Sequence, residues 1–306
     1  MKIALIGRTE ILYETARYLI NNGHSIVIII TALEAPEYTK TSEDFASLAN
    51  DLGITFLYGQ KIEEFKDELI DAKAEVGVSM NYTGIIPQSI IDIFKYGILN
   101  AHGGDLPRYR GNACQAWAII NGEKSIGLCI HKMIGGEIDS GDIIARDYSK
   151  ITDNTKIGEI WNWMKKTVPL LFNDALDKID HNKDFILEKQ SKDKTKILRC
   201  YSRRSEDGKI DWKLGAIEIL RLINATSEPY SGAFCEFESK KLIIWDAMIV
   251  DDNENFLAVP GQVTLIADDY VEIACGVGKL RLNQIEIESF RGNPRKIIKS
   301  TRSRLK

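Results

Sequence analysis

The sequence predicts an α/β domain built on a parallel sheet, followed by a smaller β-rich domain. In the first half, short apolar runs alternate with segments of helical periodicity, which is the pattern of β-α-β units. Beyond residue 205 a short helical segment precedes several β-rich runs, which glycines and Asp/Asn clusters separate. That spacing is typical of a small barrel or sandwich. A length of 306 residues suits one large and one smaller domain.

Five strands are expected in the first domain. The run SIVIIIT is continuously apolar and β-branched, as in a strand covered on both faces. Helical spacing follows the first strand and stops at Asn21-Asn22-Gly23. The expected strands cover 2–6, 25–31, 54–58, 76–80 and 97–101, and further helices are expected near 44–52 and over 155–178.

A domain boundary is expected near residue 205. The segment 181–196 is polar and lysine-rich, and it is the best candidate for a linker. The chain would then divide into domains 1–204 and 205–306, with a basic tail from about 291. In the second domain we expect a helix over 217–225 and strands over 233–237, 242–249, 262–266, 270–274 and 279–287.

Composition and charge narrow the classes of function. The chain is 44% hydrophobic and 27% charged, as in ordinary soluble globular proteins. A formal net charge of −4 argues against a long nucleic-acid track, which needs basic excess. The first apolar run is too short for a signal peptide, and no apolar stretch is long enough to cross a bilayer. We therefore expect a cytoplasmic protein without a membrane partner.

Motifs for dinucleotides and metals are missing from the sequence. Gly7 ends the first strand and is followed by Arg8-Thr9-Glu10, which is not a GxGxxG fingerprint. The five cysteines are scattered without a CxxC pair, and the four histidines are spread along the chain. We expect buried thiols and no metal site.

The end of the fifth expected strand carries the first candidate site. Asn100 and His102 lie two residues apart, so their side chains are expected on one face of the strand, at the carboxyl edge of the sheet. The turn Gly103-Gly104-Asp105-Leu106-Pro107 follows, and then the cations of RYRG. Taken alone, an Asn-x-His at a strand end is more often a hydrogen-bonded structural pair than a catalytic one.

A second candidate is the loop GGEIDSGD at 135–142, where acids and a hydroxyl stand among three glycines. Such a loop lets backbone groups approach a ligand closely. By itself it is more often only a turn.

The motifs together resemble those of the 10-formyltetrahydrofolate-dependent formyltransferases. NAHGGDLPRYRGNACQAWAIINGE resembles their Asn-x-His-x-Ser-Leu-Leu-Pro-x-x-Arg-Gly segment, and GGEIDSGDII resembles their Leu-Asp-Thr-Gly-Asp loop. CYSRRSEDGKIDW, PYSGAF and IACGVGKLRLNQIE resemble the second domain of methionyl-tRNA formyltransferases and of the aminoarabinose-pathway formyltransferase. The resemblance implies a Rossmann-like formyltransferase domain and a small OB-like β-rich domain.

This resemblance also implies the site. Asn100 and His102 would stabilise the oxyanion of a tetrahedral intermediate, and His102 would move the proton. Asp139 would orient His102 and stabilise its charged form, or relay a proton through water. The donor would be 10-formyltetrahydrofolate, and no metal is implied. The residues implied in donor binding are Gly84, Ile85, Ile86, Leu106, Pro107, Asn112, Gly135, Gly136, Glu137 and Ile138. The chain departs from the family at Asp105, where an apolar residue is usual, and at Asn112, where a small one is usual.

The acceptor is the open question, and charge favours a nucleotide-linked amino sugar over a tRNA. Residues 205–290 contain sixteen Asp/Glu and seven Lys/Arg, whereas an RNA-binding domain should be basic. The loop TALEAPEYTKTSED is short and acidic. The resemblance implies a longer, basic insertion at this position in the tRNA formyltransferases. Against this, residues 291–306 hold seven cations and no acid, although a disordered solubilising tail is the commoner explanation.

Candidate acceptor residues are Arg8, Tyr109 and Arg110, because a diphosphate needs cations or backbone N–H groups. Methionyl-tRNA formyl transfer remains the alternative. The intact Asn-His-Asp set disfavours a non-catalytic nucleotide-binding module. A formate-releasing hydrolase is disfavoured because the added N-terminal regulatory domain of those relatives is not expected here. The sequence leaves open whether the second domain serves a homodimer or a second ligand site.

Overall fold

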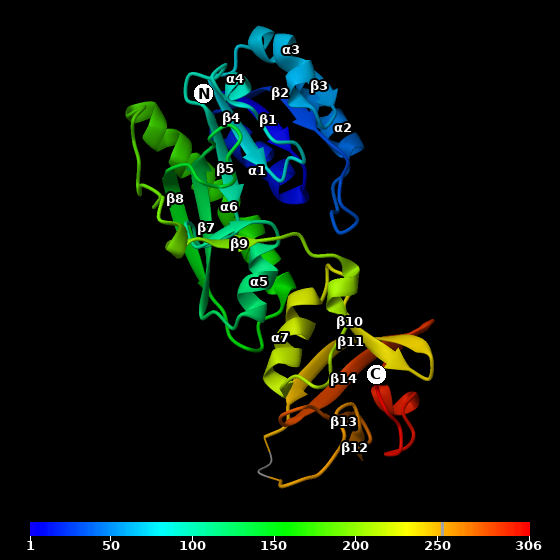
Figure 1. The fold of residues 1–306 in the computed structure, drawn as a ribbon. Coiled ribbons are helices and arrows are strands. Elements are labelled where there is room, and N and C mark those ends of the chain that lie inside the picture. Colours follow the sequence, from blue (N-terminus) through cyan, green and yellow to red (C-terminus); the bar gives the residue numbers. More distant parts are fainter. Residues whose placement is uncertain (252–253) are drawn as a thin grey trace. The chain divides into compact units, whose positions relative to one another are not determined.

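A computed structural model describes residues 1–251 and 254–306 (Figure 1). The described chain forms two compact units, each built from several segments. Unit 1 comprises Met1–Cys114, Ile126–Ser149 and Trp161–Cys200, and unit 2 comprises Gln115–Ser125, Lys150–Ile160 and Tyr201–Lys306.

Unit 1 contains a seven-stranded sheet in the order β3-β2-β1-β4-β5-β7-β8. Its strands are β1 (Lys2–Gly7), β2 (Ser25–Thr31), β3 (Thr55–Tyr58), β4 (Val76–Met80), β5 (Ile98–His102), β7 (Ser125–Lys132) and β8 (Ile143–Lys150). The first five pair in parallel, which confirms the predicted α/β class. The sequence did not predict the extension of this sheet, in which β7 pairs antiparallel with β5.

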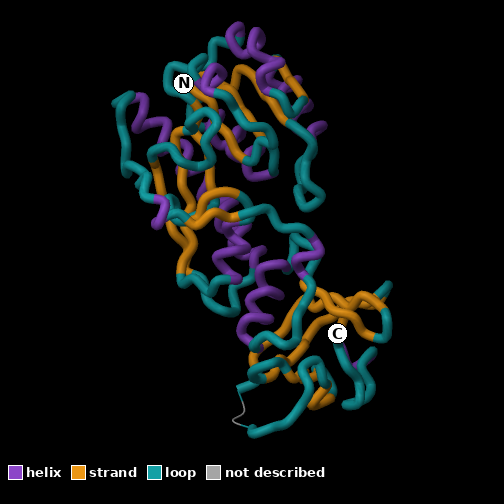
Figure 2. Tube along the Cα trace, viewed as in Figure 1, coloured by secondary structure: helices purple, strands orange, loops and turns teal. Residues whose placement is uncertain are grey.

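Helices connect these strands (Figure 2). They are α1 (Glu10–Asn21), α2 (Ser42–Leu52), α3 (Lys66–Asp71), α4 (Gln88–Ile91), α5 (Cys114–Ile120) and α6 (Ile157–His181). The short strands β6 (Tyr109–Gly111) and β9 (Leu198–Cys200) form a separate parallel pair. The helices predicted near 44–52 and over 155–178 are confirmed within three residues at each end.

Gly7 is required where β1 turns into α1. Its φ is 138°, and a Cβ atom there would lie 2.0 Å from the carbonyl oxygen of Met80. The close approach of the β1 and β4 ends therefore explains this glycine without a ligand.

Unit 2 combines α7 (Ala216–Thr226) with an antiparallel sheet in the order β10-β11-β14-β13-β12. The strands are β10 (Ala233–Phe237), β11 (Lys240–Ile249), β12 (Val263–Ile266), β13 (Val271–Ala274) and β14 (Lys279–Ile287), and β15 (Phe290–Gly292) pairs with β14. The apolar face of α7, including Ile219, Leu220 and Ile223, belongs to the same buried core as the sheet. The predicted β-rich domain is thus confirmed.

The prediction of a disordered basic tail is wrong. Ile298 and Leu305 are buried in the core of unit 2. The backbone of Lys306 exchanges two hydrogen bonds with Glu236, and Arg304 forms a bridge with Gln262. These two apolar side chains stand among the cations of the segment, a signal that the charge count obscured.

Among the described residues, no helix is both long enough and apolar enough to cross a membrane.

Candidate active site

The carboxyl end of β5 brings Asn100 and His102 into one cluster with Asp139 and His131. His102 Nδ1 lies 3.4 Å from Asp139 Oδ2, and His131 Nε2 lies 3.4 Å from Asp139 Oδ1. Asn100 Nδ2 lies 3.2 Å from the same His131 Nε2. One carboxylate therefore faces two imidazoles, and one of these imidazoles faces the amide.

Asp139 is held in an unusual backbone conformation. Its φ is 48°, in the left-handed region that a residue with a Cβ atom seldom adopts. Its Oδ2 also accepts the backbone N–H of Gly111 at 2.9 Å. Burial alone would raise the pKa of this carboxyl, but the charges of His102 and His131 and the bond from Gly111 hold the pKa well below its usual range. Asp139 is thus a carboxylate at neutral pH.

Gly104 makes room for the His102 imidazole. His102 Nε2 lies 2.7 Å from the carbonyl oxygen of Tyr109, so this nitrogen donates. A Cβ atom at Gly104 would lie 2.5 Å from that Nε2. The turn after β5 therefore needs a glycine where the resembling family has serine.

His131 was not predicted as a site residue. Its side chain is 1% exposed, and the antiparallel register pairs it directly with Asn100. An imidazole in the otherwise apolar run SIGLCIHK is the only sequence signal that points to it, and the signal gains meaning only once β7 is known to pair with β5.

Gln190 is a second residue that the sequence did not predict, and it lies in the expected linker. Its amide donates to the carbonyls of Asp139 at 2.9 Å and Gly141 at 2.6 Å, and its Oε1 accepts from Arg110 Nη2 at 2.7 Å. Its backbone N–H donates to Asp142 Oδ1 at 3.0 Å. This buried side chain fixes the loop that carries Asp139.

Of the predicted acceptor residues, Arg110 and Arg8 have protein partners, and the side chain of Tyr109 is 2% exposed. Burial lowers the pKa of Arg110, although Asp139 and Glu137 oppose this. Its Nε is buried without an acceptor among the described residues. Arg8 donates to the carbonyls of Asn81, at 2.9 Å, and Leu33, and lies over the Tyr38 ring.

Asp105 has a defined structural role. Its Oδ1 accepts from Arg146 Nη1 and from the Tyr148 hydroxyl, both at 3.0 Å. Arg146 Nη2 donates to the Leu106 carbonyl at 2.5 Å and lies 3.3 Å from Glu188. An ionic network with β8 therefore holds the turn after β5 in place.

The residues expected to bind the donor lie in three places. Ile85 is 68% exposed beside half-buried Gly84 and buried Ile86, and Ile138 is 44% exposed in the loop with Gly135, Gly136 and Glu137. Leu106 is buried, Pro107 follows a cis peptide bond, and Asn112 is exposed. Gly135 N–H donates to Gln88 Oε1 at 2.8 Å, which joins the first two places.

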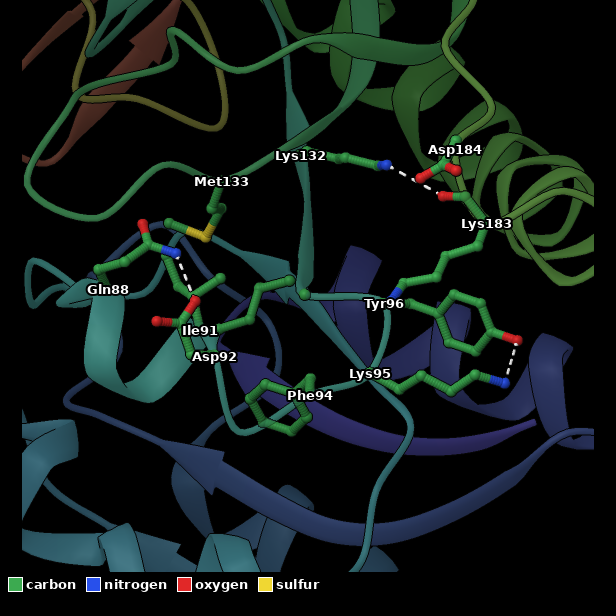
Figure 3. Close-up of a pocket in the computed structure, with 12 residues that line it drawn as sticks. Gln88, Ile91, Asp92, Phe94, Lys95, Tyr96, Lys132, Met133, Lys183 and Asp184 are labelled. Atoms are coloured by element: carbon green, nitrogen blue, oxygen red, sulfur yellow. Dashed lines mark hydrogen bonds between the residues drawn. The ribbon is translucent and has the colours of Figure 1, made fainter.

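A cavity of about 480 Å³ adjoins this junction in unit 1 (Figure 3). Gln88 belongs both to its lining and to the bond with Gly135. Apolar side chains and three lysines contribute to the lining: Ile91, Phe94, Met133, Lys95, Lys132 and Lys183. Figure 3 shows the Lys132 ammonium directed at the Lys183 carbonyl, at 3.3 Å.

Within residues 1–251 and 254–306, no group of three or more His, Cys, Asp or Glu side chains is arranged to hold a metal ion.

Two family models match the chain. The model described as formyl transferase matches residues 1–176, and the one described as formyl transferase, C-terminal domain, matches residues 203–295. The chain therefore belongs to the formyltransferase family, and it is a formyl-transferring enzyme.

Individual relatives agree with this class. The methionyl-tRNA formyltransferase of Acetivibrio thermocellus is 27% identical over 298 residues, which cover 95% of this chain and 93% of the relative. The N-formyltransferase of Helicobacter canadensis, solved with folinic acid and dTDP-3-aminofucose, matches with a TM-score of 0.69 at 19% identity, over 92% of this chain and 99% of that one. HypX of Aquifex aeolicus, solved with tetrahydrofolic acid, matches with a TM-score of 0.63 at 17% identity, over 98% of this chain and 47% of that one. At these identities the two solved structures establish a shared fold.

Proposed function

We propose that this enzyme transfers a formyl group from 10-formyltetrahydrofolate to the amine of a nucleotide-linked amino sugar, at Asn100, His102 and Asp139. The observation that carries the proposal is the Asp139 carboxylate, which lies 3.4 Å from His102 Nδ1 at the carboxyl end of β5. A carboxylate in that position can orient the imidazole, which would carry the proton in the reaction.

The chemistry requires an oxyanion donor and a proton carrier. Attack of the amine on the formyl carbon places negative charge on the formyl oxygen, and the amide N–H of Asn100 would stabilise that charge. His102 would remove a proton from the attacking amine and return one to the departing nitrogen. Asp139 would stabilise the imidazolium between these two steps.

Apolar surface supports the donor. Three exposed isoleucines, Ile85, Ile134 and Ile138, lie in the two loops that Gln88 and Gly135 join. A flat aromatic donor would cover them and extend into the cavity of Figure 3 beside Ile91 and Phe94. These exposed apolar side chains are the reason to assign 10-formyltetrahydrofolate to these loops.

Charge supports the sugar acceptor. Residues 205–290 carry nine more acids than cations, so this part of the chain would repel an RNA backbone. The solved Helicobacter canadensis enzyme holds dTDP-3-aminofucose. In this chain, Arg110, whose Nε is buried without an acceptor among the described residues, and Arg8 are the proposed phosphate partners.

Methionyl-tRNA is the second candidate acceptor. The methionyl-tRNA formyltransferases of several bacteria are 27–29% identical to this chain, and seven cations lie in residues 291–306.

The acceptor assay compares dTDP- and UDP-linked amino sugars with methionyl-tRNA, each with 10-formyltetrahydrofolate. We expect turnover with at least one nucleotide sugar and a kcat/KM for tRNA at least a hundredfold lower. Efficient formylation of the tRNA alone would show the acceptor assignment to be wrong. With the preferred acceptor, Asn100→Ala should lower kcat by about 10²–10³ without a change in the far-UV circular dichroism spectrum.

A further inference from the structure

His131 lies where it can determine the orientation of Asn100. The antiparallel pairing of β5 with β7 places the two residues directly opposite one another, and 3.2 Å separates Asn100 Nδ2 from His131 Nε2. We propose that His131 is a positioning residue, which acts through Asn100 by accepting one of its two amide N–H groups. The inference rests on the proposed role of Asn100 as an oxyanion donor.

The backbone fixes the tautomer of His131. Its Nδ1 lies 2.9 Å from the carbonyl oxygen of Lys132, and a carbonyl can only accept, so Nδ1 carries a proton. In the neutral ring, Nε2 is therefore an acceptor. The Asn100 side chain must then turn its NH₂ group, rather than its oxygen, towards His131.

This arrangement leaves one N–H of Asn100 for the substrate. An asparagine amide has two donor hydrogens and one acceptor oxygen, and without a fixed neighbour it can flip between two orientations. The flipped orientation would present an oxygen where the oxyanion develops. By removing that orientation, His131 preorganises the site before the formyl group arrives.

Protonation of His131 would undo the arrangement. The ionisable side chains that face its Nε2 are Asp139, 3.4 Å away, and His102, whose ring lies 6.3 Å from the His131 ring. A protonated Nε2 would donate to Asp139 and could no longer accept from Asn100.

Two substitutions separate positioning from packing. In His131→Gln the side-chain oxygen can still accept from the Asn100 amide, whereas His131→Leu fills similar space without an acceptor. We expect H131L to lower kcat by more than tenfold with the KM for the donor unchanged within twofold, and H131Q to keep kcat within fivefold. Native-like kcat in H131L, or a folded H131Q that loses more than fivefold, would overturn the proposal.

A double-mutant cycle tests whether His131 acts through Asn100. If it does, H131L should lower the residual kcat of N100A by less than twofold, since the amide is already gone. A further loss of tenfold would show an independent role and overturn the proposal. If H131L does not fold, the H131Q result alone decides. Retained turnover in N100A itself would instead refute the proposed function, so the two failures are distinguishable.

Discussion

Two carboxylates with little exposure, one in each unit, have very different neighbours. In unit 2, Glu272 on β13 lies 3.4 Å from Arg281 and 3.8 Å from Lys279, both on β14. In unit 1, Asp139 lies 3.4 Å from each of two imidazoles, His102 and His131. Glu272 stands in a regular antiparallel ladder, whereas Asp139 has a left-handed φ of 48° in a loop.

The difference separates a structural charge from a chemical one. Lysine and arginine keep their charge across the physiological pH range, so the Glu272 cluster serves the fold. Imidazoles gain and lose protons near neutral pH, so the Asp139 cluster can exchange protons with a ligand. The backbone conformations differ in the same way. Asp139 has the strained left-handed φ that is common at functional sites, whereas Glu272 lies in a regular strand.

The largest effect is expected from removing the His102 imidazole, which faces Asp139 and the turn after β5. His102→Ala should lower kcat by about 10²–10⁴, the range for a general acid–base group, while the melting temperature changes little. Steady-state formyl transfer at saturating donor measures it. Turnover within tenfold of the native enzyme would remove His102 from the chemistry.

A smaller loss is expected from the side chain that holds the Asp139 loop. Gln190→Ala removes the bonds to the carbonyls of Asp139 and Gly141 and the partner of Arg110. We expect kcat to fall about tenfold, because small displacements of a catalytic group are costly. The matched control is Gln284→Ala in unit 2, which should leave kcat unchanged. Equal effects of the two substitutions would contradict a positioning role for Gln190.

Substitution of Asp105 should change the free energy of unfolding more than the turnover rate. Asp105→Leu restores the apolar residue usual in the family but removes the acceptor that Arg146 and Tyr148 share. Because Asp105 is partly exposed, we expect a loss of about 1 kcal/mol in the free energy of unfolding and a kcat within threefold of native. Urea unfolding measures the first quantity. A large kcat loss without destabilisation would instead indicate direct contact with the donor.

The last expected difference between the units is in thiol reactivity. Burial raises the pKa of Cys129 to about 11 and those of Cys235 and Cys275 to about 12. A hydrogen bond from Cys114 lowers the pKa of Cys200, and the charge of Arg199 adds to this. Because only the thiolate reacts, iodoacetamide at pH 8 should label Cys200 first, as peptide mass mapping would reveal. Earlier labelling of Cys235 or Cys275 would contradict this order.

Local sequence patterns were sufficient to predict the parallel strands and to place Asn100 and His102 together near the end of β5. The run SIVIIIT predicted β2 with its observed bounds, since a buried parallel strand needs continuous apolar residues. The two-residue spacing of Asn100 and His102 predicted that both side chains lie on one face of β5, because side chains alternate along a strand.

Contacts between distant segments were beyond those patterns. His131 joins Asn100 only through the antiparallel register of β7, and Gln190 reaches Asp139 from a segment whose lysines resembled a linker. The basic segment 291–306 shows the same limitation. Its charge predicted a solvated tail, but Ile298 and Leu305 are buried. In each case a pairing partner far along the chain decided the outcome, and no local window contains that partner.

The most direct test neutralises each of the two carboxylates and measures rate and stability together. Asp139→Asn should lower kcat at least a hundredfold and leave the enzyme folded. Glu272→Gln should leave kcat within threefold and lower the free energy of unfolding by about 1.5 kcal/mol, because Arg281 and Lys279 lose a buried partner while Lys279 keeps Glu254. Native turnover in D139N, or an equal loss of turnover in a folded E272Q, would contradict the assignment of formyl transfer to the Asp139 cluster.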